Sequence, residues 1–123
     1  MPGITTAGID AALGVLDGTL YVSAHDGPPD SGSLNEANVT RQATTFSAAG
    51  NYGAVGGRSR ANAAEVLFEN VEAGTYQAWS VWTAETAGEC LWVVPFATNR
   101  TLDAGDDLRG PIDAIECYIE PDL

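Results

Sequence analysis

The sequence contains no lysine, and its positive charge is limited to five arginines against 17 acidic residues, for a net charge of −12 at pH 7. A negative field of this size repels phosphate groups, so the composition argues against nucleic acid and anionic membranes as partners. The acidity either serves solubility alone or keeps the protein soluble until it meets a basic partner. No apolar run approaches the roughly 18–20 residues of a membrane helix. Residues 1–16 lack the pattern of a signal peptide, so we expect assembly in the cytoplasm of the cell that makes it.

Histidine and cysteine are also scarce, which limits the chemistry that the chain can perform. Two cysteines, Cys90 and Cys117, are too few for a disulfide scaffold or a zinc site. Their apolar surroundings favour buried thiols, and a single bridge between neighbouring strands stays open. His25, beside Asp26, is the one candidate general base, but no G-x-S-x-G nucleophile motif accompanies it. We therefore expect no catalytic residues and no cofactor.

One loop contains acidic residues that are candidate metal ligands. Asp26, Asp30 and Glu36 crowd a short stretch and offer oxygen ligands of the kind that calcium prefers. The spacing of an EF-hand loop is absent, however. The sequence therefore predicts no metal site, although it leaves a bound calcium ion open.

Residues 4–16 have the pattern of a short helix. Ile9, Leu13 and Leu16 recur at spacings of four and three, and Thr5 or Thr6 is placed to cap the first turn. A helix of this length is not stable alone, so its apolar face must dock on its own sheet or on a neighbouring subunit. We expect a docking helix in residues 1–18 and a β-sandwich domain in residues 19–123.

Most of the remaining chain reads as short strands separated by glycine-rich turns. The strand candidates are residues 20–25, 41–46, 63–69, 75–83, 90–97, a short piece at Leu108, and residues 112–119. Pro95 in the fifth candidate indicates an edge strand or a bulge. Residues 47–62 are rich in Gly, Ala and Ser and are predicted to form a long loop. Short strands at this spacing predict an all-β fold: an antiparallel, jelly-roll-like β-sandwich of six to eight strands.

Tryptophan and arginine are the side chains with the clearest potential for binding. Trp79 and Trp82 are three residues apart on one strand, so they face opposite sides and do not form one sugar platform without a bulge. Arg41, Arg58 and Arg60 are candidates for bidentate contacts with carboxylates of the chain or of a partner. Arg58 and Arg60, however, lie in the glycine-rich segment and are expected to be solvated.

Several motifs, taken in order, resemble a family of small structural proteins of tailed bacteriophages. The matching segments are residues 20–30 (LYVSAHDGPPD), 35–36 (NE), 41–46 (RQATTF), 66–75 (VLFENVEAGT), 79–84 (WSVWTA) and 104–108 (AGDDL). The sequence departs from the pattern at Asn38-Val39-Thr40, where the family usually has Gly-rich residues and an aromatic. The resemblance implies a part of the virion and implies no catalytic residues.

These observations predict a non-enzymatic structural component of a tailed-phage virion. It is expected to be either a minor tail or tail-fibre-associated protein or a decoration protein on the capsid. Its partners would be other virion proteins, with the chain itself in a homo-oligomer or symmetric array and residues 1–18 and 47–62 carrying most contacts. The alternative is a carbohydrate-binding module that recognises a host glycan. The predicted interface residues are Ile9, Leu13, Leu16, Arg41, Tyr52, Arg58, Arg60 and Trp82.

Overall fold

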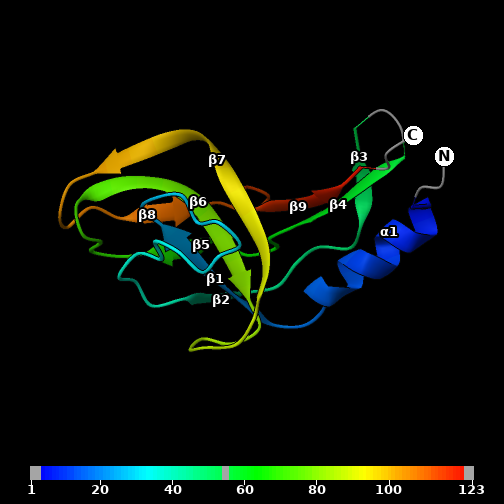
Figure 1. Ribbon diagram of the computed structural model, residues 1–123, viewed down its shortest axis with the longest axis horizontal. Helices are drawn as coiled ribbons and strands as arrows, with labels where there is room; N and C mark the ends of the chain where they lie inside the picture. Colours follow the sequence, from blue (N-terminus) through cyan, green and yellow to red (C-terminus); the bar gives the residue numbers. More distant parts are fainter. Residues whose placement is uncertain (1–3, 54–55, 121–123) are drawn as a thin grey trace.

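The computed structural model describes residues 4–53 and 56–120, which form one α-helix, one 3-10 turn and nine strands (Figure 1). The helix is α1 (Thr6–Leu13), and the turn η1 (Gly14–Leu16) follows it directly. The strands are β1 (Leu20–His25), β2 (Gln42–Thr44), β3 (Gly50–Tyr52), β4 (Gly57–Ala61), β5 (Val66–Phe68), β6 (Gly74–Trp82), β7 (Cys90–Leu102), β8 (Leu108–Gly110) and β9 (Glu116–Ile119).

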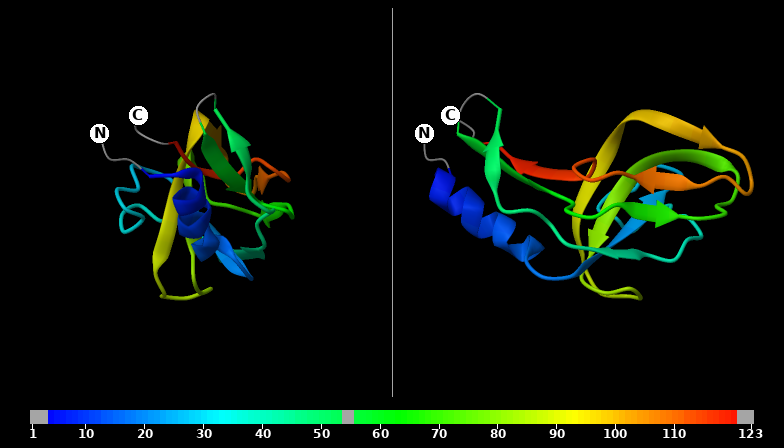
Figure 2. Two further views of the ribbon diagram at one scale, coloured as in Figure 1. Left: turned by 90° about the vertical axis from the view of Figure 1, so that its right-hand side faces the viewer. Right: turned by 180° about the vertical axis from the view of Figure 1, so that it is seen from behind.

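All the ladders are antiparallel, and they form three sheets. The largest sheet has the order β2-β1-β6-β7, the second has the order β3-β4-β9, and β5 pairs with β8. Figures 1 and 2 show an elongated molecule with α1, β3 and β4 at one end and the arching strands β6 and β7 toward the other. The prediction of an antiparallel all-β, sandwich-like fold with a short N-terminal helix is confirmed.

The N-terminal helix docks on the chain's own β3-β4-β9 sheet. The Thr5 hydroxyl caps it by accepting a hydrogen bond from the Gly8 N–H at 3.1 Å, a contact that stabilises a helix by about 1 kcal/mol. Ile9, Leu13 and Leu16 are 0 % exposed and belong to one hydrophobic core that also contains β1, β5 and β6 residues. The sequence left open whether the apolar face of the helix docks on its own sheet or on a neighbouring subunit, and the structure shows that it docks on its own sheet.

The segment of residues 47–62 is not the loop that its composition predicted. It contains β3 and β4, which pair with each other, and β4 also pairs with β9. Along β4 the residues alternate: Arg58 and Arg60 point toward the helix, where they bond Asp10 and Asp17, and Gly57, Ser59 and Ala61 lie on the other face. Glycine and serine have low strand propensity, so the local sequence hides a strand that packing and hydrogen bonds impose.

The central strands β1 and β6 are covered on both faces. One face carries Val22, Trp79 and Val81, which pack into the core. Residues 26–40 extend the ladder at the edge of β1 through the His25–Glu36 bridge, and they also cover the other face, where the Leu34 carbonyl oxygen lies 2.8 Å from His25 Nδ1. This double burial explains why Ser23, His25 and Ser80 are buried polar side chains.

Strand β7 forms one edge of the large sheet and contains an irregularity. The register with β6 shifts between the pairs Tyr76↔Arg100 and Ala78↔Pro95, so residues 96–99 bulge. The prediction that Pro95 marks an edge or a bulge is confirmed on both counts. Beyond the bulge, β7 continues to Leu102, five residues further than its apolar run indicated.

Because Leu13 packs entirely inside this chain, Leu13→Ala should destabilise the isolated protein. We expect the free energy of unfolding to fall by about 2–5 kcal/mol, the usual cost of a Leu-to-Ala cavity. Val15→Ala, at a side chain that is 49 % exposed on the neighbouring turn, should cost less than about 0.5 kcal/mol. Urea unfolding followed by tryptophan fluorescence measures both. Equal effects of the two substitutions would mean that the helix is not docked in solution.

Candidate functional site

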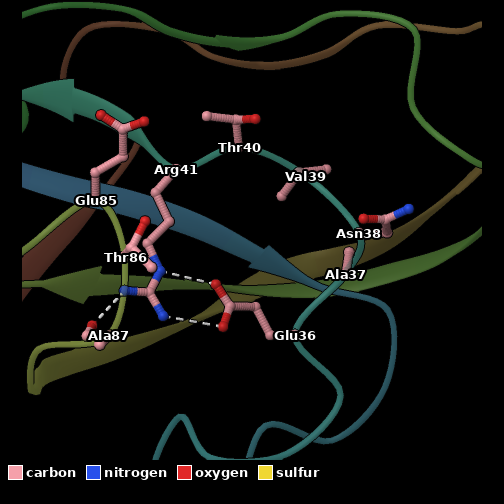
Figure 3. A pocket seen from close by; sticks show the side chains of 9 residues that line it. All are labelled: Glu36, Ala37, Asn38, Val39, Thr40, Arg41, Glu85, Thr86 and Ala87. Carbon is pink, nitrogen blue, oxygen red and sulfur yellow. Dashed lines mark hydrogen bonds and ion pairs between the residues drawn. The ribbon is translucent and has the colours of Figure 1, made fainter.

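Arg41 is at the centre of a polar cluster beside a surface pocket (Figure 3). Its Nε and Nη2 atoms donate to the two carboxylate oxygens of Glu36 at 2.9 and 3.1 Å. Its Nη1 atom donates to the carbonyls of Ala84 (3.1 Å) and Ala87 (2.6 Å), and its Cζ atom lies 3.7 Å from the centre of the Trp82 ring. The side chain is only 9 % exposed. Arg41 therefore fastens the 26–40 segment and the β6–β7 turn to each other and to β6.

The electrostatics of this cluster favour a charged Glu36. The hydrogen bonds from Arg41 lower the pKa of the Glu36 carboxyl below its ordinary value of 4.5, against the opposing effect of burial. A pocket of about 560 Å³ opens beside the cluster, between residues 36–41 and 85–87. Because Glu36 and the two carbonyls occupy most of the Arg41 donors, this pocket is not an anion site.

His25 and Ser80 form a second polar contact, at first sight like a base and its nucleophile. The His25 Nε2 atom lies 2.7 Å from Ser80 Oγ, and Nδ1 lies 2.8 Å from the Leu34 carbonyl oxygen. A carbonyl only accepts, so Nδ1 carries the proton and Nε2 accepts from the Ser80 hydroxyl. Ser80 Oγ in turn accepts from Trp82 Nε1 at 2.7 Å. Both His25 and Ser80 are fully buried, so the pair is an internal network that no substrate reaches in this fold.

The structure does not bring Asp26, Asp30 and Glu36 together as metal ligands. Among residues 4–53 and 56–120, no three His, Cys, Asp or Glu side chains are grouped closely enough to hold an ion. Glu36 faces Arg41 instead of Asp26 or Asp30. Both cysteines have free thiols, and burial raises the pKa of the Cys117 thiol to about 12.

Arg58 and Arg60 are not the solvated side chains that the glycine-rich sequence predicted. Arg58 bonds Asp10 Oδ1 at 2.9 Å and Asn51 Oδ1 at 2.8 Å. Arg60 bonds Asp17 Oδ1 at 2.6 Å and donates to the carbonyls of Leu13, Ser47 and Phe46. The two guanidinium groups tie the helix to β4, and the free backbone carbonyls near the helix end explain why arginines are needed there.

The predicted interface residues are thus used mainly inside the chain. Ile9, Leu13 and Leu16 are 0 % exposed, so these three side chains cannot contact a neighbouring subunit while the helix stays docked. The rest of the predicted interface stays a prediction. Trp82 lies under Arg41, which leaves the sugar-platform alternative without support at this ring. Residues 1–3 and 54–55 of the two proposed contact segments lie outside the described residues.

Tyr52, another predicted interface residue, lies beside the exposed ring of Tyr118. Its ring stacks on Tyr118 with centroids 4.2 Å apart and 14° between the planes. Tyr118 and Trp92 line a groove between β7 and β9. Trp92 was considered from the sequence only as one of three tryptophans, and Tyr118 was not considered. The alternation of Glu116 and Tyr118 with Cys117 and Ile119 was the available signal, since it places polar and aromatic side chains on one face of a strand.

The described part of the chain is therefore a β-rich scaffold whose polar clusters hold its own segments together, as in a structural protein. None of its helices has the length and apolar character of a membrane span. A family model described as "Podophage GP4 fiber I protein gp80" matches residues 15–117. The chain belongs to this family, which indicates a phage fibre protein and so a structural component of the virion. No curated protein is a significant match.

The Arg41 cluster predicts a pH-dependent share of the stability. Glu36→Gln should lower the free energy of unfolding at pH 7 by about 1–3 kcal/mol, because it removes a charged acceptor from a nearly buried guanidinium. The folded pKa of Glu36 is depressed, so this share is present above the unfolded value near 4.5 and is lost as the pH falls through the folded value. Urea unfolding of both proteins from pH 7 to pH 3 should therefore show the difference between them shrinking.

The matched control for this measurement is Glu65→Gln, which breaks the more exposed pair of Glu65 with Arg109. We expect a change below about 0.5 kcal/mol at pH 7. A wild type and Glu36→Gln variant that stay equally far apart at pH 3 would contradict the proposed role of the Glu36 carboxylate.

Proposed function

We propose that the chain is a non-enzymatic building block of a tailed-phage virion that sits in the tail, as a fibre-associated or minor tail protein. The observation that carries this proposal is the match of residues 15–117 to a podophage fibre protein. The alternative location, as a decoration protein on the capsid, has no such support. Assembly in the host cytoplasm follows from the same reasoning, since virion parts come together where they are made.

The distribution of interactions in the structure supports a building block over an enzyme. The one histidine is buried against Ser80, and the carboxylates of Asp10, Asp17 and Glu36 each bind an arginine of the same chain. Such contacts hold irregular segments rigid, which suits a part that must present a fixed surface to its neighbours. We expect these neighbours to be other virion proteins, in an arrangement that repeats the chain symmetrically.

Composition and imaging of the purified particle test this proposal. Mass spectrometry should find the chain in particles purified by density gradient, and cryo-electron microscopy should place its density on the tail in a copy number set by the tail symmetry. Particles from a phage that lacks the gene should lose that density and keep their capsid shell. Density on the capsid lattice would transfer the chain to the decoration class, and its absence from particles would refute the virion role.

A further inference from the structure

The β3-β4-β9 sheet has one face covered by the helix, and its other face is open along β9, at Tyr118, while Ser59 on β4 is buried. Arg58 and Arg60 point to the helix side, so Ser59, between them, points the other way. Ser59 pairs with Tyr118 across the β4–β9 ladder, and its hydroxyl donates to Glu116 Oε2 at 2.8 Å. Tyr118 and Glu116 therefore lie on the open face, and Tyr118 is 47 % exposed.

This open face continues into a groove of about 450 Å³ between β9 and the edge strand β7. The groove is lined by Trp92, Val93, Val94, Pro95, Glu116 and Tyr118. Its volume lies in the range of sites that hold a small ligand or a few side chains of a partner. Tyr52 stacks behind Tyr118, and the backbones of β3 and β4 approach closely there, since a Cβ atom at Gly57 would lie 2.2 Å from the Tyr52 carbonyl oxygen. The Tyr118 ring is thus held in place before any partner arrives.

The charged side chain that lines the groove, Glu116, is acidic. Burial raises the pKa of the Tyr52 phenol, and the neighbouring Tyr118, Glu116 and Glu120 add to the effect. Of the two carboxylate oxygens of Glu116, Oε2 accepts a hydrogen bond from the Ser59 hydroxyl. Among the described residues no side chain donates to Oε1, so this oxygen is left for a group in the groove. Aromatic rings next to carboxylates attract a cation, through the ring faces and through the charge together.

The Arg41 cluster shows how an aromatic ring and a carboxylate of this chain bind a guanidinium group together. At the Arg41 cluster a guanidinium lies 3.7 Å from the centre of the Trp82 ring and forks onto the carboxylate of Glu36. The groove presents an equivalent set, with the rings of Trp92 and Tyr118 and the carboxylate of Glu116, and no arginine of the chain lines it.

A second copy of the chain is poorly suited to supply that cation. The sequence has no lysine, and all five arginines have contacts within their own chain. Four are in ion pairs, with Glu36, Asp10, Asp17 and Glu65. Arg100 donates to the Arg109 carbonyl and lies over the Phe96 ring. Two copies of net charge −12 also repel each other at the acidic groove.

We propose that the Trp92–Tyr118–Glu116 groove is a docking site for an arginine- or lysine-bearing segment of a different virion protein. This proposal rests on the proposed function and identifies the surface and the partner chemistry that it leaves unnamed. The acidic net charge then speeds the encounter with a basic partner, and the rings and the carboxylate fix the position of the incoming side chain.

Titration of the isolated protein with a short peptide tests the chemistry of the groove. The probe is Ac-Gly-Arg-Gly-Arg-Gly-NH₂, and the control peptide carries citrulline, which keeps the shape and loses the charge. NMR signals of the Trp92 indole N–H and the Tyr118 ring should shift with the arginine peptide only, and less at high salt. Shifts of equal size with citrulline, or with a neutral disaccharide instead of the peptide, would overturn the proposal.

Variants locate the binding on this face. Glu116→Gln keeps the acceptor for Ser59 and removes the charge, and Tyr118→Ala removes the exposed ring. Each should weaken peptide binding about tenfold, as expected for the loss of one charge-assisted contact. Glu69→Gln, the same charge change elsewhere, and Ile112→Ala, at a side chain 59 % exposed, should bind as the wild type does. Equal weakening in Glu69→Gln would reduce the effect to net charge and refute a specific site.

A cross-linking experiment in the assembled particle separates this proposal from the proposed function. A photoreactive phenylalanine analogue at position 118 should cross-link to a different virion protein, in a chymotryptic peptide that contains an arginine or lysine beside the cross-linked residue. Cross-links to a second copy of the chain, in particles that contain it, would overturn the docking site and leave the virion role intact. Absence of the chain from the particles would refute the proposed function itself.

Discussion

The contacts of Arg41 are the constraint on which the arrangement of the irregular segments depends. One guanidinium reaches Glu36, two carbonyls of the β6–β7 turn and the face of Trp82, so it joins residues 36–41 to residues 82–87, a segment more than 40 residues further along the chain. Burial of apolar side chains supplies most of the stability of a domain this size, but it is not directional. The fixed fork of the guanidinium determines how the 26–40 segment lies on β1 and β6.

The sequence predicted the parts of the fold whose signals are local. The helix cap at Thr5 or Thr6, the spacing of Ile9 and Leu13, the strand at residues 20–25 and the position of Pro95 were predicted correctly because each depends on a few neighbouring residues. The strands β3 and β4 were missed for the opposite reason. Their Gly, Ser and Arg residues favour no strand by themselves, and only pairing with β9 and the contacts of Arg58 and Arg60 with Asp10 and Asp17 make them strands.

The candidate site was predictable in kind more than in place. An arginine–carboxylate pair was expected at Arg41, yet its partner, Glu36, and its contact with Trp82 depend on how the 26–40 segment folds back. The destination of the helix was open in the sequence, because an apolar stripe does not say which surface covers it. The groove beside Tyr118 could not be found at all, since it forms between two strands of different sheets, β7 and β9.

The edge strand β7 has a further consequence for a protein that works in an assembly. Thirteen residues of strand with an uncovered backbone edge would ordinarily invite other chains to add strands, which is how amyloid-like aggregates grow. Pro95 has no N–H to donate, and the bulge at residues 96–99 bends the strand, so the edge is a poor template for this growth. The chain can therefore be crowded into a particle and still associate through side chains, not through indiscriminate backbone pairing.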